Sequence, residues 1–200
     1  VDTGHVLDSA IATSWSLLTD EGRGALARLS IFAGAPVLEA LESITQAPLP
    51  VLDELFDAGL VRVHPGSSGR RFSLFDAIRD FGAVHLGPEE RAAAGALHSA
   101  WYARLGPDAE NAQCRSDWAQ YRIFHQADLA DVRLAAERST SAREVLHCLR
   151  AAHRLGHIEQ DPPPWTRQLA DPLVDHVELS GTERCEAGWI ALTRVRLGTP

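Results

Sequence analysis

The stretch between Pro48 and Leu86 constrains the fold more than any other part of this chain. In order, it contains an amphipathic helical pattern at 51–58, Gly59, an apolar run at 60–63, a Gly- and Pro-containing turn at 65–69, a second short run at 71–74 and a helical pattern from Asp76. Two short runs around such a turn predict a β-hairpin, and the 3.6-residue periodicity on either side predicts helices. Helix, strand, turn, strand and helix in this order indicate a winged helix-turn-helix with a small β-wing.

Three further helical patterns precede this stretch. Their apolar positions fall within 7–18, 25–32 and 37–44, with breaks at Thr19-Asp20 and at Gly34-Ala35-Pro36. Thr and Asp are favoured N-caps, while Gly and Pro end helices. The last two of these helices and the helix at 51–58, followed by the wing, would make a trihelical core. We therefore expect a winged helix domain over 1–87 that ends at Gly87-Pro88.

From Pro88 onward the sequence predicts helices only. They are a helix at 89–105 stopped by Gly106-Pro107, a long helix from 116 to 135, a helix capped by Ser139-Thr140-Ser141 and ended by Gly156, a short helix at Trp165 and a last helix after Gly181-Thr182. In the last helix, Cys185, Trp189, Leu192 and Val195 fall on one side, and we expect the region near Trp189 to be covered by a contact with another molecule. Helices joined by short loops indicate a repeat-like, TPR-like arm over 88–200. The chain as a whole is predicted to be mostly α-helical.

The charge of the chain bears on its partners. The formal net charge is −8, and all 19 basic residues are arginine. Over 1–87, six arginines stand against eleven acidic residues, a net charge of −5. This balance argues against a dedicated nucleic-acid binder, because such proteins neutralise phosphates with basic residues. No apolar run approaches the length that spans a bilayer, so no membrane partner is expected.

The three cysteines are Cys114, Cys148 and Cys185, and they form neither a CxxC pair nor a metal-ligand cluster. An odd number of separated cysteines favours reduced thiols and hence a cytoplasmic location. The chain contains no methionine, even at position 1, and we expect it to be a piece of a longer protein with a truncated helical arm.

An ordered set of short motifs resembles one family. The motifs are LDSAIATSWSLL at 7–18, LSIFAG at 29–34, VLDEL at 51–55, GLV at 59–61, RFSL at 71–74, IRDF at 78–81, Trp118, and ADLADVR at 127–133. Together they resemble the segment that follows the nucleotide-binding core in bacterial STAND regulators, the signal-transduction ATPases with numerous domains. The resemblance implies a winged helix that packs on an ATPase core, followed by a helical arm that senses signals or scaffolds partners.

Two departures from the family limit what this segment is expected to bind. The family's phosphate-binding glycine loop ends in Lys-Ser or Lys-Thr, and this chain has no lysine. In NB-ARC-type relatives a Met-His-Asp motif places its histidine near the phosphate of bound ADP, and the matching positions here are Leu74, Phe75 and Asp76. Phe75 cannot donate a hydrogen bond to phosphate, and Asp76 fits an N-cap equally well. No cofactor is therefore expected.

The hairpin carries the first set of candidate contact residues. Arg62, Arg70 and Arg71, with His64 and Asp76 nearby, could bind an anion or contact another domain, and a solvated turn is the plain alternative. The helix in the recognition position carries three carboxylates, Asp53, Glu54 and Asp57, and no basic residue. Carboxylates repel DNA phosphates, so this helix opposes DNA binding.

The helical arm carries the second set. Trp165 follows three prolines, and we expect it to be exposed; Trp165 and Trp189 are the candidates for a partner surface. His153 and His157 have the four-residue spacing of a helical metal site, but Gly156 would break that helix, so no metal is expected. No GxSxG elbow is present, and capping explains the paired carboxylates at helix starts, so no catalytic residues are expected.

The sequence therefore predicts a non-catalytic regulatory segment of a larger signal-transduction ATPase or transcription regulator. It would relay nucleotide state or mediate protein–protein interaction, and its expected partners are the ATPase core of the parent chain and an unidentified protein. The alternative is a DNA-binding winged-helix module of a transcription regulator. The acidic recognition helix favours the first interpretation.

Overall fold

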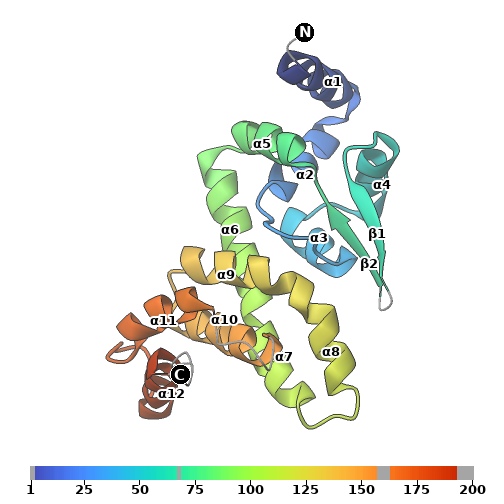
Figure 1. Cartoon of the computed structure of the whole chain (residues 1–200). Coiled ribbons are helices and arrows are strands. Elements are labelled where there is room, and N and C mark those ends of the chain that lie inside the picture. The colour runs from blue at the N-terminus through green and yellow to red at the C-terminus, as the bar shows by residue number, and fades with distance from the viewer. Residues whose placement is uncertain (1–2, 67–68, 157–162, 193–200) are drawn as a thin grey trace. The chain divides into compact units, whose positions relative to one another are not determined.

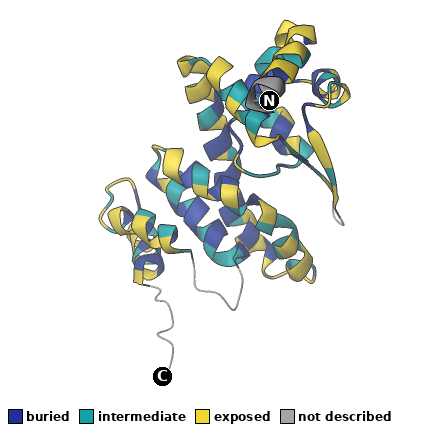
Figure 2. Ribbon diagram, turned by 45° about the horizontal axis from the view of Figure 1, so that its top comes forward, coloured by how far each residue is buried: buried dark blue, intermediate teal, exposed yellow. Residues whose placement is uncertain are grey.

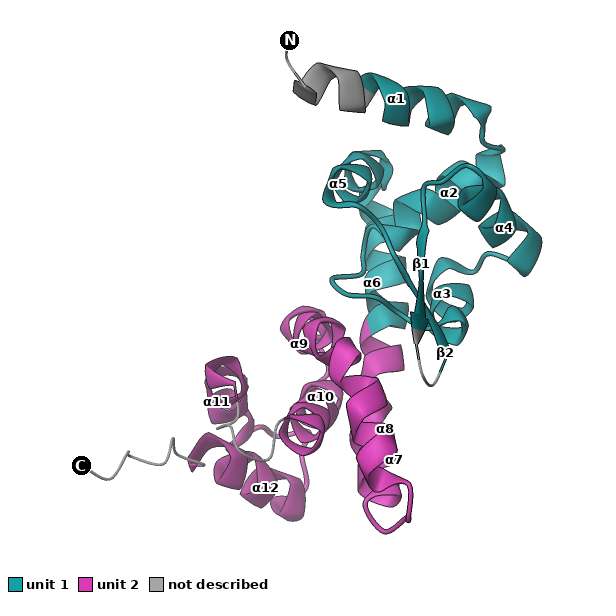
Figure 3. Cartoon of the chain, turned by 45° about the vertical axis from the view of Figure 1, so that its right-hand side comes forward, with its two compact units in different colours: residues 1–98 teal, residues 99–200 magenta. Residues whose placement is uncertain are grey.

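The structure is a computed structural model, and it describes residues 3–66, 69–156 and 163–192. The described residues are mostly helical, with one small antiparallel sheet of two strands, as the sequence predicts (Figure 1). The chain divides into two compact units, Val1–His98 and Ser99–Pro200 (Figure 3). The division lies within helix α6 (Pro88–Ala103), later in the chain than the expected boundary after Gly87.

Unit 1 contains five complete helices and the hairpin among its described residues. These are α1 (Thr3–Leu17), α2 (Asp20–Leu29), α3 (Leu38–Thr45), α4 (Leu49–Asp57), β1 (Arg62–Gly66), β2 (Gly69–Ser73) and α5 (Asp76–His85), followed by the first part of α6. The hairpin differs from its prediction in detail. Leu60 and Val61 are buried but precede β1, and the strands reach into the expected turn, with β1 ending at Gly66 and β2 beginning at Gly69.

Helix α2 is central to the core of unit 1 and packs against α3, α4 and α5. Figure 2 shows how buried and exposed residues are distributed along the helices. Leu26 and Leu29 of α2 are buried, as are Leu41, Leu52 and Leu55 of the neighbouring helices. Helix α5 approaches α2 closely at Gly82, where an added Cβ would lie 3.1 Å from the carbonyl oxygen of Leu26. The periodic apolar residues in the sequence therefore bury the faces that the helical spacing predicts.

Only one edge of the two-stranded sheet is open in the described residues. The N–H of Phe72 donates to the carbonyl oxygen of Pro36 (2.9 Å), and Val37 bridges Arg71, so the segment before α3 covers the outer edge of β2. Pro65 in β1 lies opposite Arg70, two positions along the ladder from the Val63–Phe72 pair. Because the backbone nitrogen of Phe72 faces away from β1, the alternation of the ladder turns the nitrogen of Pro65 away from β2, toward the open edge. A proline with no N–H on the open edge discourages pairing with another strand.

Local sequence signals explain several helix ends in unit 1. Thr19 is the N-cap of α2, and its Oγ1 accepts the N–H of Gly22 (3.0 Å), as predicted. Gly59 follows α4 in the left-handed region (φ +68°), which glycine adopts without a Cβ clash. Helix α5 begins at Asp76, as predicted, but Asp76 is not its N-cap. The N-cap position is Phe75, and Asp76 in the first turn pairs with Arg79 at 2.6 Å.

Unit 2 is helical throughout its described residues. After the end of α6 come α7 (Leu105–Ala112), α8 (Trp118–His125), the 3₁₀ turn η1 (Gln126–Asp128), α9 (Leu129–Arg138), α10 (Ala142–Leu155), α11 (Pro164–Ala170), η2 (Asp171–Leu173) and α12 (Gly181–Leu192). Two predictions are wrong here. Gly106 and Pro107 lie in the first turn of α7, where proline is tolerated, and the expected helix at 116–135 is interrupted by η1.

Helix α10 organises unit 2. It is capped by Ser141 and ends at Gly156, both as predicted, and it packs on α7, α9 and α11. Leu146 and Leu149 are fully buried in a cluster shared with α11 and α12. On another side, α7 approaches so closely that a Cβ on Gly106 would lie 2.3 Å from the carbonyl oxygen of His147. This contact requires glycine at position 106.

Candidate interaction surfaces

The hairpin does not bring its three arginines to one face. In the register of the strands, Arg62 lies opposite Ser73, and His64 lies opposite Arg71. These four residues share one face of the ribbon, because side chains opposite each other point to the same side. Arg70 lies opposite Pro65 and therefore points to the other face, the one that carries the buried Phe72.

The polar groups on the hairpin make different local contacts. The guanidinium of Arg62 lies 4.6 Å from the ring centroid of Phe75, which is 51% exposed. Half-buried Arg71 donates from Nη1 to the carbonyl oxygen of Ala35 (2.8 Å), and His64 Nε2 lies 2.7 Å from Ser73 Oγ. Arg71 therefore holds the backbone before α3, while Arg62 and Arg70 are exposed.

A small pocket lies within unit 1, next to the hairpin. It is lined by Leu29, Phe32, Gly34, Pro36, Leu41, Val61, Phe72, Ser73, Leu74 and Arg79. Its cavity volume is about 10 Å³, which is roughly the space of one water molecule. Ligand pockets are far larger, so this pocket is a packing defect.

Helix α4, in the recognition position, has an acidic outer face. Asp53 and Asp57 are exposed. Glu54 is half-buried and accepts two hydrogen bonds from Thr19, one from its N–H (2.6 Å) and one from its Oγ1 (2.7 Å). Glu54 therefore joins α4 to the start of α2, and the other two carboxylates are what a partner would meet.

Several arginines of unit 1 bind backbone carbonyls at helix ends. Arg23 donates to the carbonyl oxygens of Trp15 (3.1 Å) and Ser16 (3.0 Å), and Arg28 donates to that of Thr45 (2.6 Å). Arg91 in the same way reaches the carbonyl oxygens at the end of α5. These side chains satisfy acceptors that a helix end leaves without an intrahelical partner.

The two tryptophans proposed as a partner surface differ in exposure. Trp165 is half-buried and packs against the core of unit 2, so the prediction that it is exposed is wrong. Trp189 is 60% exposed, and Leu192 is 78% exposed. The buried residues of α12 are Ala187, Ile190 and Ala191, so the side that carries Trp189 and Leu192 is not the one packed on the core.

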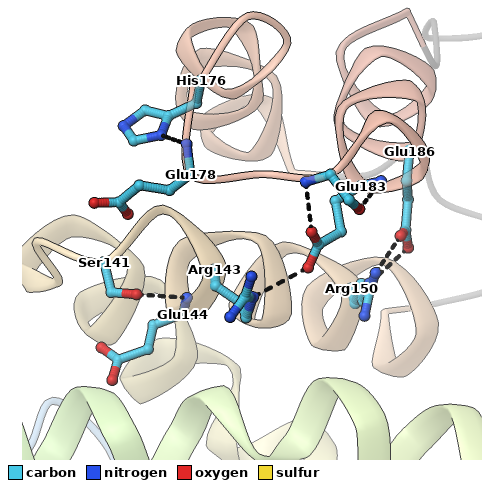
Figure 4. A network of polar contacts seen from close by, with 9 residues as sticks. Ser141, Arg143, Glu144, Arg150, His176, Glu178, Glu183 and Glu186 are labelled. Carbon is cyan, nitrogen blue, oxygen red and sulfur yellow. Dashed lines mark hydrogen bonds and ion pairs between the residues drawn. The ribbon is translucent and has the colours of Figure 1, made fainter.

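A row of polar and aromatic pairs joins α10 to α12. Arg143 Nε lies 3.2 Å from Glu183 Oε1, and the guanidinium of Arg150 forms a two-point contact with the Glu186 carboxylate, with Nε 2.8 Å from Oε1 (Figure 4). The third pair is the stack of the His153 and Trp189 rings, with centroids 4.7 Å apart. We call these three pairs the α10–α12 ladder. Residue numbers rise together on both helices, so α10 and α12 run in the same direction.

The start of α12 adds a further hydrogen-bonded element to the ladder. Glu183 accepts the N–H of Ser180 (2.8 Å), and the N–H of Glu183 donates to Ser180 Oγ (3.3 Å) (Figure 4). This reciprocal pair is a capping box. The hydrogen bonds from Ser180, supported by Arg143, lower the pKa of Glu183 from 4.5 to about 2. The sequence did not indicate the ladder, because its partners are 36 to 40 residues apart.

A second polar pair was also missed. His125 Nδ1 lies 2.7 Å from Asp128 Oδ2, and Asp128 is buried in the turn η1. The Tyr121 ring lies against His125, and burial, together with the charges of Asp108 and Asp128, raises the pKa of Tyr121 to about 12. Its phenol therefore stays protonated at neutral pH, and the pair's evident role is to hold the junction of α8 and α9.

No family model, curated protein or solved structure matches this chain. The geometry of the two units is therefore what bears on its function.

The described ranges 3–66, 69–156 and 163–192 lack two further features. Within them, no group of three or more His, Cys, Asp and Glu side chains could hold a metal ion. His157, the second member of the spaced histidine pair, lies outside the described residues. In the same ranges, no helix is both long enough and apolar enough to cross a membrane.

Proposed function

We propose that this chain is a non-catalytic regulatory segment of a cytoplasmic STAND-type protein. A winged helix module over 1–87 would contact the ATPase core of the parent chain, and a TPR-like arm over 88–200 would bind a protein partner. The order α2, α3, α4, hairpin and α5 supports the winged helix. Helices α10 and α12 run in the same direction with α11 packed against both, which supports the helical repeat.

We favour protein contact over DNA binding because of the contacts that the arginines of unit 1 make. Of the six arginines in 1–87, Arg23, Arg28 and Arg71 donate to backbone carbonyls and Arg79 pairs with Asp76. A DNA reader needs such groups for phosphates. The recognition-position helix instead presents Asp53 and Asp57. This distribution of charge favours a protein partner.

The arm offers an apolar surface that suits a protein partner. Trp189 and Leu192 lie one turn apart on α12 and are both well exposed. Exposed tryptophan is enriched among the residues that dominate binding energies at protein interfaces. We therefore keep Trp189 as the partner residue of the arm and remove the half-buried Trp165 from that role.

DNA binding through the hairpin is the second candidate, because Arg62 and Arg70 are exposed. A titration against random-sequence duplex DNA at low and high salt separates the two functions. We expect no salt-sensitive binding. Two arginine–phosphate contacts would give a slope of about −2 in log K against log salt. Tight binding with such a slope, lost when Arg62 and Arg70 are both replaced by alanine, would reverse the ranking.

Nucleotide chemistry gives a separate test. The purified chain is expected neither to bind nor to hydrolyse ATP, because it has no lysine for a phosphate-binding loop. Turnover of ATP that copurifies with the chain and persists in Asp76→Ala would contradict a non-catalytic role. An isothermal titration with ATP and magnesium measures binding directly.

A further inference from the structure

The α10–α12 ladder places two histidines among arginines whose carboxylate partners are already engaged. Arg143, His147, Arg150 and His153 follow one another along one side of α10 at helical spacing. Across from them, Glu183 binds Arg143 and Glu186 binds Arg150 (Figure 4). The two carboxylates therefore balance the two guanidiniums, and a positive charge on a histidine would be in excess.

His153 is the histidine of the ladder whose surroundings most disfavour protonation. Its ring is stacked on Trp189, with centroids 4.7 Å apart and planes inclined by 29°. The Nε2 atom is buried and has no hydrogen-bond partner among the residues that the structure describes. In the imidazolium both ring nitrogens are donors, so protonation would leave a buried N–H without an acceptor. Burial lowers the pKa of His153; a hydrogen bond with the backbone acts in the opposite direction and the charge of Arg154 in the same one, and the net shift is downward.

His147 lies between the two arginines of the ladder. Burial lowers its pKa first, and Arg150 and Arg143 lower it further, while Glu183 and Glu186 act in the opposite direction. The net shift is downward. Burial and the two arginines therefore outweigh the two carboxylates in their effect on the pKa of His147.

Helices other than α12 also pack against α10. Among the described residues, their charged groups do not act on the pKa of His147 or His153. They are Glu110 of α7, which binds Arg154; Arg122 of α8, which reaches the carbonyl oxygen of Gly156; the buried Asp131 of α9; and the exposed Arg167 of α11.

We propose that α12 is a pH-sensitive latch, in which protonation of His153, assisted by His147, opens the α10–α12 ladder and releases the Trp189 side of α12. The latch is independent of the function proposed above. Both histidines bind protons more weakly in the closed ladder than in the released state, so release is favoured as pH falls below about 6.5. Below the closed-state pKa of a histidine, each pKa unit of lowering multiplies the release equilibrium about tenfold.

The test follows Trp189 and α12 in the full chain from about pH 7.5 to about pH 5, the range in which histidine titrates. The fluorescence of Trp189 is obtained by subtracting the signal of the Trp189→Phe variant. Hydrogen exchange of the α12 amides, corrected for intrinsic rates, reports release. We expect exchange to rise about tenfold or more across this range.

Three variants make the result specific. His153→Gln and the double variant with His147→Gln cannot protonate, and we expect α12 exchange to become independent of pH in the double variant. His176→Gln is the matched control, because His176 lies in unit 2 outside the ladder and only accepts the N–H of Glu178 (Figure 4). This control should keep the wild-type profile. An unchanged profile in the double variant would overturn the proposal.

A direct titration covers the case in which the variants fail to fold. The imidazole of His153 in the wild-type chain is followed by NMR, and its pKa should lie below 6.5. Attraction between an imidazolium and the Trp189 ring acts against the latch. A measured pKa at or above 6.5 would mean that this attraction dominates, and the latch would be wrong.

Discussion

Replacing Gly106 by alanine should destabilise unit 2 strongly, and the structure allows the size of the effect to be worked out. An ideal Cβ at this position would lie 2.3 Å from the carbonyl oxygen of His147 and 2.9 Å from its carbonyl carbon. Both obstacles are backbone atoms of α10, so no side-chain rotation can relieve the contact. Helices α7 and α10 would have to separate by about 1 Å to reach an ordinary van der Waals distance.

Such a separation has an estimable free energy. Overpacking of a well-packed core destabilises proteins by about 1–3 kcal/mol, and a clash between backbones belongs at the upper end. Alanine is favoured over glycine in a helix by at most about 1 kcal/mol. The net loss for Gly106→Ala is therefore about 2–3 kcal/mol. For a unit of this size, the melting temperature would fall by about 10 °C or more.

Urea denaturation followed by circular dichroism measures the effect, with thiol labelling of the buried Cys148 as a probe local to unit 2. Gly188→Ala is the matched control. Gly188 is also helical, lies in α12, and has only Val174 Cγ1, at 4.0 Å, near an added Cβ. The control should gain up to about 1 kcal/mol. Equal stability of the two variants would refute the close approach of α7 and α10.

Three further predictions concern single side chains. Glu54→Ala removes both acceptors of Thr19 and should lower the free energy of unfolding by about 1–2 kcal/mol, measured by urea denaturation. Cys148, whose pKa burial raises to about 12, should react with a thiol reagent at pH 8 far more slowly than the two exposed cysteines. Because the Glu183 pKa is lowered from 4.5 to about 2, its carboxylate stabilises the fold above pH 4.5, and this contribution should disappear as pH falls toward 2. Glu183→Gln should show a smaller acid-induced loss of stability over that range.

Features set by neighbouring residues in the chain were predicted well from the sequence. Thr19, Gly59, Ser141 and Gly156 start or end their helices as expected, because capping hydrogen bonds and left-handed backbone depend on a few adjacent residues. The mostly helical content and the hairpin followed from periodicity and turn residues. Helix α5 begins at Asp76 as predicted, while the N-cap position is Phe75 rather than Asp76, a typical one-residue uncertainty at helix ends.

Features set by tertiary packing were not predictable in the same way. Gly106 was interpreted as a helix stop, whereas its small size serves the approach of α10 about forty residues later. On α12 the small Ala187 and Ala191, rather than the larger Trp189, are buried, and residue size along the helix does not indicate this side. The ladder joins residues 36 to 40 positions apart, and no local pattern gives such a pairing.

The contacts of its arginine side chains limit which charges unit 1 would present to a partner. A guanidinium presents several N–H donors in a planar fork, so Arg23 can bind the carbonyls of Trp15 and Ser16 at once. Arginines used in this way are withdrawn from the surface contacts that the sequence alone would assign to them. The charges left for a partner are then unevenly placed, with Asp53 and Asp57 on α4 and Arg62 and Arg70 on the hairpin. Like charges that face each other across an interface are strongly disfavoured. A partner would therefore need positive charge opposite α4 and negative charge opposite the hairpin.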